Sequence, residues 1–372
     1  MSRKGEIYIG LMSGTSLDGV DVAVVDFASF PPRVIHCSTD PYPRDIRQAL
    51  QQLCRDQSTT LDALYRLDAA LADIYAGSVG RSLTAAGLDA AEVVALGCHG
   101  QTLRHSPDTD PPYTAQIGDP SRLAALSGID TVADFRRKDI ALGGQAAPLA
   151  PAYHRFLFRS RDENRVVINI GGIANLTWLP RDTAAPLLGF DTGPGNTLLN
   201  YWIEKHQGLR FDENGNWARG GRIDEELLAN MIDTEAYFQA AAPKSTGTEY
   251  FSPDWLEGFL PASPEPRDIQ ATLVELTAAT IAAAVSALPE AAENCYVCGG
   301  GTHNAYLLER LHLRLPDRGL QTTAALGMDP DFVEAAAFAW LARERIALRA
   351  ANIPEITHAR RETLLGGIYA AD

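Results

Sequence analysis

The stretch Gly10-Leu-Met-Ser-Gly-Thr-Ser-Leu-Asp-Gly-Val-Asp21 decides the fold that this sequence predicts. Apolar runs with strand character, residues 6–11 and 20–27, lie on either side of it, which indicates a turn between two neighbouring strands. A glycine-rich turn exposes a row of backbone N–H groups, and glycine lets that backbone approach an anion closely. We therefore expect an anion-binding loop at this turn.

A second glycine-rich turn, Asn169-Ile-Gly-Gly-Ile-Ala-Asn-Leu-Thr177, repeats the arrangement later in the chain. Apolar runs at 166–170 and 173–179 flank it in the same way. Neither Gly-x-x-x-x-Gly-Lys-Ser/Thr nor Gly-x-Gly-x-x-Gly occurs at a strand-to-helix turn, which argues against the P-loop and Rossmann folds. Two such turns in one chain predict two lobes that hold one polyphosphate.

Composition limits the class of protein. The chain has 372 residues, which favours two domains of ordinary size, and 46% of them are hydrophobic. No apolar run approaches the roughly 20 residues of a membrane span, and the N-terminus shows no signal-peptide core. Five cysteines, an odd number, favour a reducing cytoplasm. The net charge of −15, without a basic cluster, argues against nucleic acid or a membrane as partner.

Hydrophobic periodicity predicts that one order of elements occurs twice: a three-strand meander, then helices, then a further strand. The strands are expected at 6–12, 20–27, 33–38, 93–98 and 131–134, and again at 165–170, 173–179, 187–191 and 295–298. The helices are expected at 43–54, 60–86, from Asp119-Pro120 onward, and at 196–207, 224–231, 267–288, 304–311 and 329–349. Residues 241–266, rich in proline, glycine and serine, are expected to form a long surface excursion.

The stretch Asp191-Thr-Gly-Pro-Gly-Asn196 is the sharpest local signal for chemistry. It follows the apolar run 187–190 and precedes a predicted helix, which places a carboxylate at the end of a strand. Such a carboxylate, in a turn of glycine and proline, is well placed to lie in a cleft. The alternative is that Asp191 only caps the next helix or bonds the turn backbone.

The glycine-rich stretches supply candidate ligands for a nucleotide. Hydroxyl and N–H groups of the first turn suit phosphate oxygens, and Asp18 suits hydrated Mg²⁺. The triple glycine at 299–301 would let an adenosine lie against the backbone at the start of a helix. The alternative for the first turn is an ordinary hairpin, and the alternative for the triple glycine is a tight turn without a ligand. The candidates are Gly14, Thr15, Ser16, Leu17, Asp18, Gly19, Val20 and Asp21 in the first turn, Gly171, Gly172 and Asn175 in the second, and Gly299, Gly300 and Gly301.

Polar residues at predicted strand and helix ends of the first lobe are candidates for a substrate wall with local positive charge. Arginine suits a carboxylate because its donors form a fork. The alternative is that several are solvated surface charges, and that Glu334 only favours the dipole of its helix. The set comprises His99, Gln101, Arg122, Asp134, Arg136, Arg137, Lys138 and Glu334.

Cys295-Tyr-Val-Cys298 lacks a second ligand pair, so structural thiols are expected there rather than zinc.

With these residues in view, the chain resembles the anhydro-N-acetylmuramic acid kinase family of the sugar kinase/actin-like ATPase superfamily. The motifs that carry the resemblance include Gly97-Cys-His-Gly-Gln-Thr102 and Ile117-Gly-Asp-Pro-Ser-Arg122. The others lie at 10–21, 132–136, 143–148, 169–177, 189–196, 298–304 and 334–340, so the resemblance runs nearly end to end. It implies an α/β, two-lobed actin-like fold with a duplicated mixed-sheet core and a central cleft.

The resemblance also implies an activity. A 1,6-anhydro amino sugar from cell-wall turnover is opened by water and phosphorylated on its sixth oxygen with ATP and Mg²⁺, giving N-acetylmuramic acid 6-phosphate and ADP. The catalytic aspartate of the family falls on Asp191 and its ATP-binding stretch on residues 14–21. The family further suggests a homodimer.

We expect a first lobe at 1–135, with the first phosphate loop and part of the sugar site, and a second lobe at 136–372, with a C-terminal tail that packs back on the first. Two other functions stay open from the sequence. One is a kinase of an ordinary amino sugar, and the other is a nucleotide-dependent assembly protein on an actin-like fold.

Overall fold

The computed structural model describes residues 6–14, 17–56, 58–242 and 244–372. By its internal contacts the chain forms two units, Met1–Tyr153 with Phe332–Asp372, and His154–Asp331. The expected lobe boundary after residue 135 therefore falls inside the first unit, which also holds the last long helix. Each unit is described by itself.

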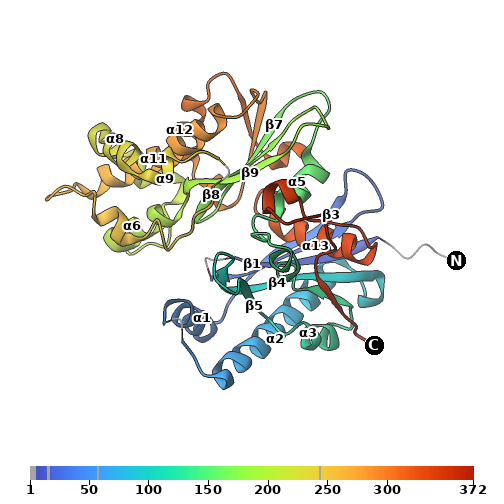
Figure 1. Cartoon of the computed structure of the whole chain (residues 1–372). Coiled ribbons are helices and arrows are strands. Elements are labelled where there is room, and N and C mark those ends of the chain that lie inside the picture. Colours follow the sequence, from blue (N-terminus) through green and yellow to red (C-terminus); the bar gives the residue numbers. More distant parts are fainter. Residues whose placement is uncertain (1–5, 15–16, 57, 243) are drawn as a thin grey trace. The chain divides into compact units, whose positions relative to one another are not determined.

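The first unit contains a mixed sheet of seven strands in the order β12-β6-β4-β1-β2-β3, with β5 paired to β4 (Figure 1). Its strands are β1 (Ile7–Ser13), β2 (Gly19–Asp26), β3 (Arg33–Pro41), β4 (Val93–Ser106), β5 (Tyr113–Ile117), β6 (Thr131–Ala133) and β12 (Gly367–Tyr369). Its helices are α1 (Arg44–Asp56), α2 (Leu61–Ala86), η1 (Ala90–Glu92), α3 (Pro120–Ser127), α4 (Arg137–Ala141), α13 (Val333–Ile346) and α14 (Pro354–Thr357), and α5 (Ala150–Phe158) crosses the border between the units.

The second unit contains a sheet of five strands in the order β11-β10-β7-β8-β9. Its strands are β7 (Arg165–Ile170), β8 (Ile173–Leu179), β9 (Leu188–Pro194), β10 (Asn294–Cys298) and β11 (Gly319–Thr322). Its helices are α6 (Thr197–Gln207), η2 (Glu213–Gly215), α7 (Asn216–Arg219), α8 (Glu225–Thr234), α9 (Ala236–Gln239), α10 (Pro253–Glu257), α11 (Pro266–Ser286), η3 (Gly300–His303), α12 (Ala305–Arg314) and η4 (Thr323–Leu326).

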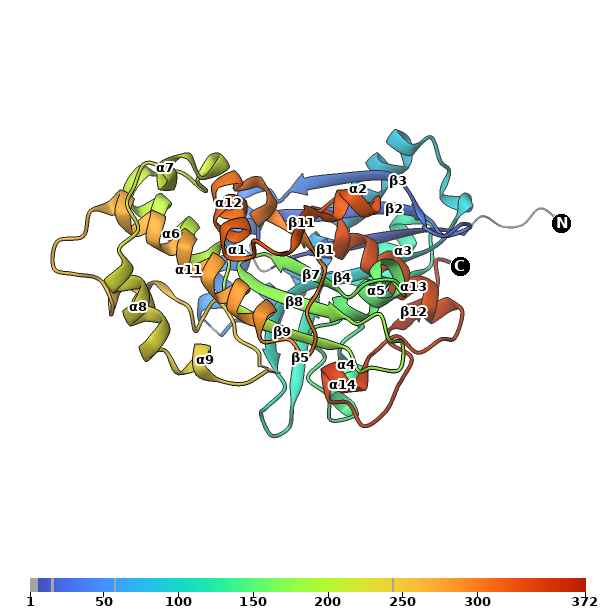
Figure 2. The same ribbon diagram turned by 90° about the horizontal axis from the view of Figure 1, so that it is seen from above.

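The two sheets confirm the expected duplicated α/β core. In each, a meander of three antiparallel strands comes first, β1-β2-β3 or β7-β8-β9 (Figure 2). A later strand, β4 or β10, then pairs in parallel with the first strand of the meander, and β6 or β11 follows in parallel beyond it. The expected cap of α3 is also confirmed, since the Asp119 side chain accepts from the amides of Ser121 and Arg122.

Several strands depart from the expectation: β5, β11 and β12 were not expected, and β3, β4 and β9 are longer than predicted. β4 does not end at Cys98 but runs on to Ser106 and forms a hairpin with β5, which the sequence pattern did not show. β9 does not end at Asp191 but continues to Pro194. In both cases most of the continuing residues are polar or glycine, so hydrophobic alternation does not mark them, and they pair with a neighbouring strand.

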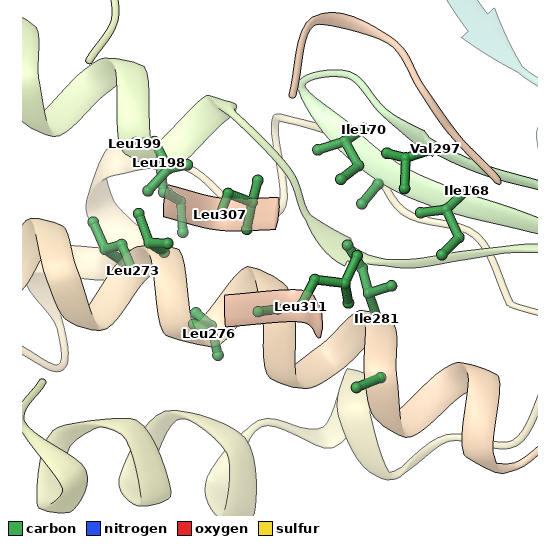
Figure 3. Close-up of a cluster of buried hydrophobic side chains, with 14 of the residues drawn as sticks. Ile168, Ile170, Leu198, Leu199, Leu273, Leu276, Ile281, Val297, Leu307 and Leu311 are labelled. Atoms are coloured by element: carbon green, nitrogen blue, oxygen red, sulfur yellow. The ribbon is translucent and has the colours of Figure 1, made fainter. Parts of the chain in front are cut away.

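The core of the second unit is built around α11. Figure 3 shows Leu273, Leu276 and Ile281 of this helix among apolar side chains of α12 and of the sheet. Contrary to the expectation from composition, α11 is long and apolar enough to cross a membrane by those criteria alone. Since 83% of its most apolar window is buried inside the protein, we assign it as a core helix.

The first unit depends on a close contact between α13 and its sheet. A Cβ on Gly10 of β1 would lie 1.8 Å from the carbonyl oxygen of Ala335, and one on Gly97 of β4 would lie 2.0 Å from that of Phe338. The backbone of α13 therefore rests directly on two glycines that face each other in the parallel β1–β4 pair. Ala335, Ala339 and Ala342 lie at this contact, and their small buried side chains allow the helix to approach the sheet.

We predict that Gly10→Ala or Gly97→Ala destabilises the protein by at least about 2 kcal/mol, because the added methyl group overlaps backbone that cannot move aside. Urea unfolding measures the change. Gly80→Ala in α2 is the matched control, because nothing lies within 4 Å of its added Cβ, and it should raise stability slightly. Equal effects at the three positions would refute the contact.

Candidate active site

Asp191 lies in β9, where three groups from a later segment hold it. Its amide donates to the carbonyl of Lys244 at 3.0 Å, and its carbonyl accepts from the hydroxyl of Tyr237 at 2.8 Å. Its Oδ2 accepts from the amide of Thr246 at 3.0 Å. Burial raises the pKa of Asp191 to about 6, and the Thr246 amide opposes that rise. The result is a carboxylate that can act as a base near neutral pH.

The segment that holds Asp191 includes part of the expected surface excursion at 241–266. That expectation is wrong in part, because Phe251 and Leu256 are fully buried. The ring of Phe251 stacks on Phe238 at 5.4 Å and meets Trp255 edge-on at 5.1 Å. The many aromatic residues from 237 to 259 were the sequence signal for a packed segment. The prolines and glycines around them favoured the interpretation as a surface loop instead.

The second glycine turn is joined to the stretch around Asp191. The carbonyl of Gly171 accepts from the amide of Asn196 at 2.8 Å, and that of Gly172 accepts from Gly195 at 2.9 Å. Asn175 of β8 lies directly opposite Asp191 in the register of the β8–β9 pair. The two candidate motifs of this unit therefore form one structure at the carboxyl ends of β7 and β9, which run in the same direction.

The triple glycine lies at the same edge, after β10. Gly299 has a φ of +82°, and a Cβ on it would lie 2.3 Å from Oδ1 of Asn169, while one on Gly301 would lie 2.5 Å from Cβ of Ile170. These two glycines are required by packing. Gly300 differs, since its Cβ would meet only Asn196 Nδ2, at 4.0 Å. Backbone open to a ligand is thus present at Gly300.

The first glycine turn is described in part, because Thr15 and Ser16 lie outside the described residues. The carbonyl of Gly14 accepts from the amide of Leu17 at 3.4 Å and from Nε2 of Gln101 at 3.1 Å. Leu17 has a φ of 55°, Asp18 is exposed, and the three residues that follow belong to β2. Among these three, Gly19 approaches the carbonyl of Asp40, Val20 is fully buried, and Asp21 accepts from the hydroxyl of Thr39 at 2.6 Å.

A network of buried hydroxyl groups supports this turn, and sequence reasoning missed it. The hydroxyl of Tyr42 donates to Ser13 Oγ at 2.7 Å and lies 3.2 Å from the hydroxyl of Tyr75, which is 3.0 Å from Ser13. The hydroxyl of Tyr42 also lies 3.4 Å from Oε1 of Gln101. Gln101, expected in the substrate wall, therefore links this network to Gly14. No local pattern joins four residues so far apart in sequence.

His99, Arg136 and Glu334 of the expected substrate wall come together. Nε and Nη2 of Arg136 lie 3.1 and 3.0 Å from Nε2 of His99, and Nη1 donates to the carbonyl of Ala146 at 2.5 Å. Burial lowers the pKa of Arg136 to about 10, while the charge of Glu334 opposes that shift. Burial and the neighbouring guanidinium hold the pKa of His99 well below its usual range, so the imidazole is neutral.

Arg122 and Asp134 are placed differently. Arg122 makes a two-point contact with Asp73 of α2, at 2.7 and 3.0 Å, and both side chains are about half exposed. Asp134 has a φ of 61° and lies 3.5 Å from Nε of Arg137. Burial raises the pKa of Asp134. Arg122 thus has its forked donors directed at a partner that the sequence did not indicate.

Cys295 and Cys298 are buried in β10. Across the described ranges, no group of three or more His, Cys, Asp or Glu side chains is arranged to hold a metal ion. Burial raises the pKa of Cys295 to about 11, which keeps it a thiol at neutral pH.

A family model described as anhydro-N-acetylmuramic acid kinase matches residues 6–371. The chain belongs to this family. It is 48% identical to the anhydro-N-acetylmuramic acid kinase of Shewanella loihica over 97% of this chain and 98% of that one. It is also 48% identical to that of Pasteurella multocida, over 97% and 96% of the two chains. A solved activator of 2-hydroxyisocaproyl-CoA dehydratase from Clostridium difficile aligns over 93% of this chain and 99% of its own at 12% identity, with a TM-score of 0.44.

We predict that Asp191→Asn stabilises the protein at neutral pH and not in acid. The raised folded-state pKa means that the ionised carboxylate opposes folding above about pH 6, whereas below about pH 4 it is protonated in both states. The variant should gain up to about 3 kcal/mol near pH 7.5, and the gain should vanish near pH 4. Urea unfolding at both pH values measures this, and a less stable variant near pH 7.5 would contradict the buried setting.

Proposed function

We propose that this protein is an ATP-dependent kinase that opens 1,6-anhydro-N-acetylmuramic acid with water and phosphorylates O6, giving N-acetylmuramic acid 6-phosphate and ADP. The observation that carries the proposal is Asp191, whose main chain is held by two hydrogen bonds and whose carboxylate accepts a third and has a pKa of about 6, in a chain of this kinase family. The reaction belongs to the recycling of cell-wall peptidoglycan. We further propose a cytoplasmic homodimer.

The role of the base follows from the substrate. In an ordinary sugar kinase, a carboxylate takes the proton of the attacking hydroxyl. In the anhydro sugar O6 is bonded to the anomeric carbon and carries no proton, so Asp191 is free to take a proton from water. As that water attacks the anomeric carbon, the bond from this carbon to O6 breaks, and O6 attacks the γ-phosphorus of ATP with release of ADP.

One carboxylate suffices for this chemistry. An inverting glycosidase needs a base for the water and an acid for the leaving oxygen. Here the γ-phosphoryl group captures the leaving oxygen, so no acid is required. This is consistent with the single carboxylate of the Asp191 stretch, and it couples ring opening to phosphoryl transfer.

The residues present fit a nucleotide. Gly300 leaves its backbone open, and a Cβ on Gly171 would meet only the carbonyl of Ile173, at 3.5 Å. We propose that Gly171, Gly172, Asn175 and Gly299–Gly301 in the second unit, and residues 14–21 in the first, bind ATP. Asp18 would hold Mg²⁺ through water, and the ion would neutralise phosphate charge. The exposed carboxylate of Asp18 fits that use.

For the sugar, we propose the cluster of His99, Arg136 and Glu334. A buried guanidinium with a neutral imidazole beside it suits a carboxylate such as that of N-acetylmuramic acid. Gln101 and Asp134 stay in the proposed sugar site. Arg122 has the weakest case, because Asp73 already occupies its donors.

A coupled assay of ADP release, with the anhydro sugar present and absent, tests the function directly. Release that depends on the anhydro sugar supports it. Faster release with a free amino sugar would favour an ordinary amino-sugar kinase. Nucleotide-dependent filaments in a sedimentation assay, without sugar-dependent release, would favour an assembly protein. Sedimentation velocity tests the homodimer.

We predict that Asp191→Asn lowers turnover at least about 100-fold, because an amide cannot take the proton of water. ATP binding should be unchanged. In the wild type, turnover should fall as pH drops below about 6, since protonation removes the base. Steady-state assays across pH measure both effects, and turnover of the variant within a few-fold of wild type would exclude Asp191 as the base.

We predict that oxygen from solvent water appears on the anomeric carbon of the product, with inversion, so that the α-anomer forms first. The ring should stay closed without ATP, and free N-acetylmuramic acid should be a poor acceptor because its anomeric hydroxyl takes the place of the attacking water. NMR of fresh product made in ¹⁸O-labelled water reads all of these. Label absent from that carbon, or the β-anomer first, would contradict the coupled mechanism.

A further inference from the structure

Asp139 of α4 is a fully buried carboxylate to which the proposed reaction gives no role. Its Oδ2 accepts from the amide of Ala146 at 2.8 Å. Its Oδ1 accepts from Nδ2 of Asn352 and from the hydroxyl of Thr357, both at 2.9 Å. All three donors are neutral, and a charge buried among neutral donors costs free energy that an uncharged side chain would not. Folding alone therefore does not explain why this side chain is charged.

The glycine-rich motif at 143–148 is shaped around this carboxylate. The amide of Gly144 donates to the carbonyl of Asp139 at 2.9 Å, and a Cβ on Gly144 would lie 2.1 Å from Oδ2 of Asp139. Ala146 has a φ of 53°, a left-handed conformation that is uncommon for a residue with a side chain. The motif thus leaves space for the carboxylate and directs one amide to it.

Ala146 also links Asp139 to the cluster of His99, Arg136 and Glu334. While its amide donates to Asp139, its carbonyl accepts from Nη1 of Arg136 at 2.5 Å. Burial lowers the pKa of Arg136 to about 10, and the negative charges of Glu334 and Asp139 both oppose that fall. Asp139 is therefore a second counter-charge for this guanidinium, joined to it through one residue.

The contacts of Arg136 leave it able to bind a further group. Nε and Nη2 lie 3.1 and 3.0 Å from Nε2 of His99, and Nη1 donates to Ala146. Among the described residues these hydrogen bonds take three of the five N–H groups of the guanidinium, so one remains on Nη1 and one on Nη2. Arg136 retains some exposed surface. The carbonyl of Ala146 thus helps to set the direction of the donors that a ligand would meet.

The last segment of the chain fixes the other oxygen of Asp139. Oδ1 of Asn352 accepts from the amide of Thr363 at 2.7 Å, and the carbonyl of Thr357 accepts from the amide of Gln145 at 2.6 Å. The two side chains that donate to Asp139 are therefore held by further hydrogen bonds of their own residues. The carboxylate cannot shift toward Ala146 or away from it without losing one of these contacts.

We propose that Asp139 is a positioning residue of the sugar site, which holds the carbonyl of Ala146 at Arg136 and offsets the cost of burying that guanidinium. The group that it serves is the carboxylate of the sugar, because this is the partner that forked arginine donors fit. The proposal rests on the proposed function, since it needs the anhydro sugar at Arg136. Asp139 is fully buried and acts through Arg136 without contacting the sugar.

Asp139→Asn keeps the shape of the side chain and removes its charge. It should raise the KM for the anhydro sugar about 10-fold or more, while the KM for ATP stays within about twofold of wild type. Inhibition by 1,6-anhydro-N-acetylglucosamine, the same ring without the carboxylate-bearing group, should change less than about twofold. Asp130→Asn is the matched control, because the Asp130 carboxylate also accepts from an amide near the end of the chain, that of Ala371 at 2.9 Å. Its KM for the anhydro sugar should match that of wild type.

Thr357→Val and Thr357→Ser test the same contact without changing the carboxylate. The valine variant loses the hydroxyl that donates to Asp139 and should raise the KM for the anhydro sugar about threefold or more. The serine variant keeps a hydroxyl and should stay within about twofold of wild type. This pair decides the question if Asp139→Asn does not fold, since equal KM values in the two variants overturn the proposal and a rise confined to valine supports it.

Wild-type ADP release that does not respond to the anhydro sugar would refute the proposed function itself. With a responsive wild type, a KM for the anhydro sugar within twofold of wild type in Asp139→Asn overturns the positioning role. An equal rise in the KM for ATP, or an equal loss of inhibition by the sugar without the carboxylate, overturns it as well, because either result indicates a general distortion of the fold.

Discussion

The contact of α13 with Gly10 and Gly97 is the constraint on which the first unit depends. Because the helix backbone lies against the sheet without intervening side chains, the residues that α13 carries are set at a fixed depth above β4. Phe338 is thereby placed against the ring of His99, with 4.7 Å between ring centres. Glu334 lies near enough to Arg136 for its negative charge to oppose the fall in the pKa of that guanidinium. A helix from the end of the chain thus completes a polar cluster that begins on β4.

In the second unit the corresponding feature is the partly buried carboxylate of Asp191. Burial raises the pKa of Asp191, which suits the base of the proposed reaction, and it also disfavours the ionised form, which opposes stability. The Thr246 amide limits the conflict, because a hydrogen bond to the charged form lowers the pKa. The aromatic packing of residues 237–255 holds that amide in place, which makes the segment part of the site.

Local rules account for most of what the sequence predicted correctly. The two meanders follow from hydrophobic alternation, and Asp119-Pro120 starts α3 as capping rules require. What local rules miss is contact between distant residues. Asp73 occupies Arg122 across 49 positions, and Thr246 reaches Asp191 across 55. No window of sequence contains both partners, so only the folded chain reveals which candidate side chains are already engaged.

The glycines show most clearly that a sequence pattern does not by itself assign a structural or binding role to each residue in it. In the sequence Gly299, Gly300 and Gly301 are indistinguishable, and all three are candidates to contact a nucleotide. In the folded chain two of them are required because Asn169 and Ile170 occupy the space of a side chain, and only Gly300 presents open backbone. The same division separates Gly10, which lies under a helix, from Gly171, which does not. In this chain the glycines required by packing and the glycines with open backbone lie side by side, and only the folded structure tells them apart.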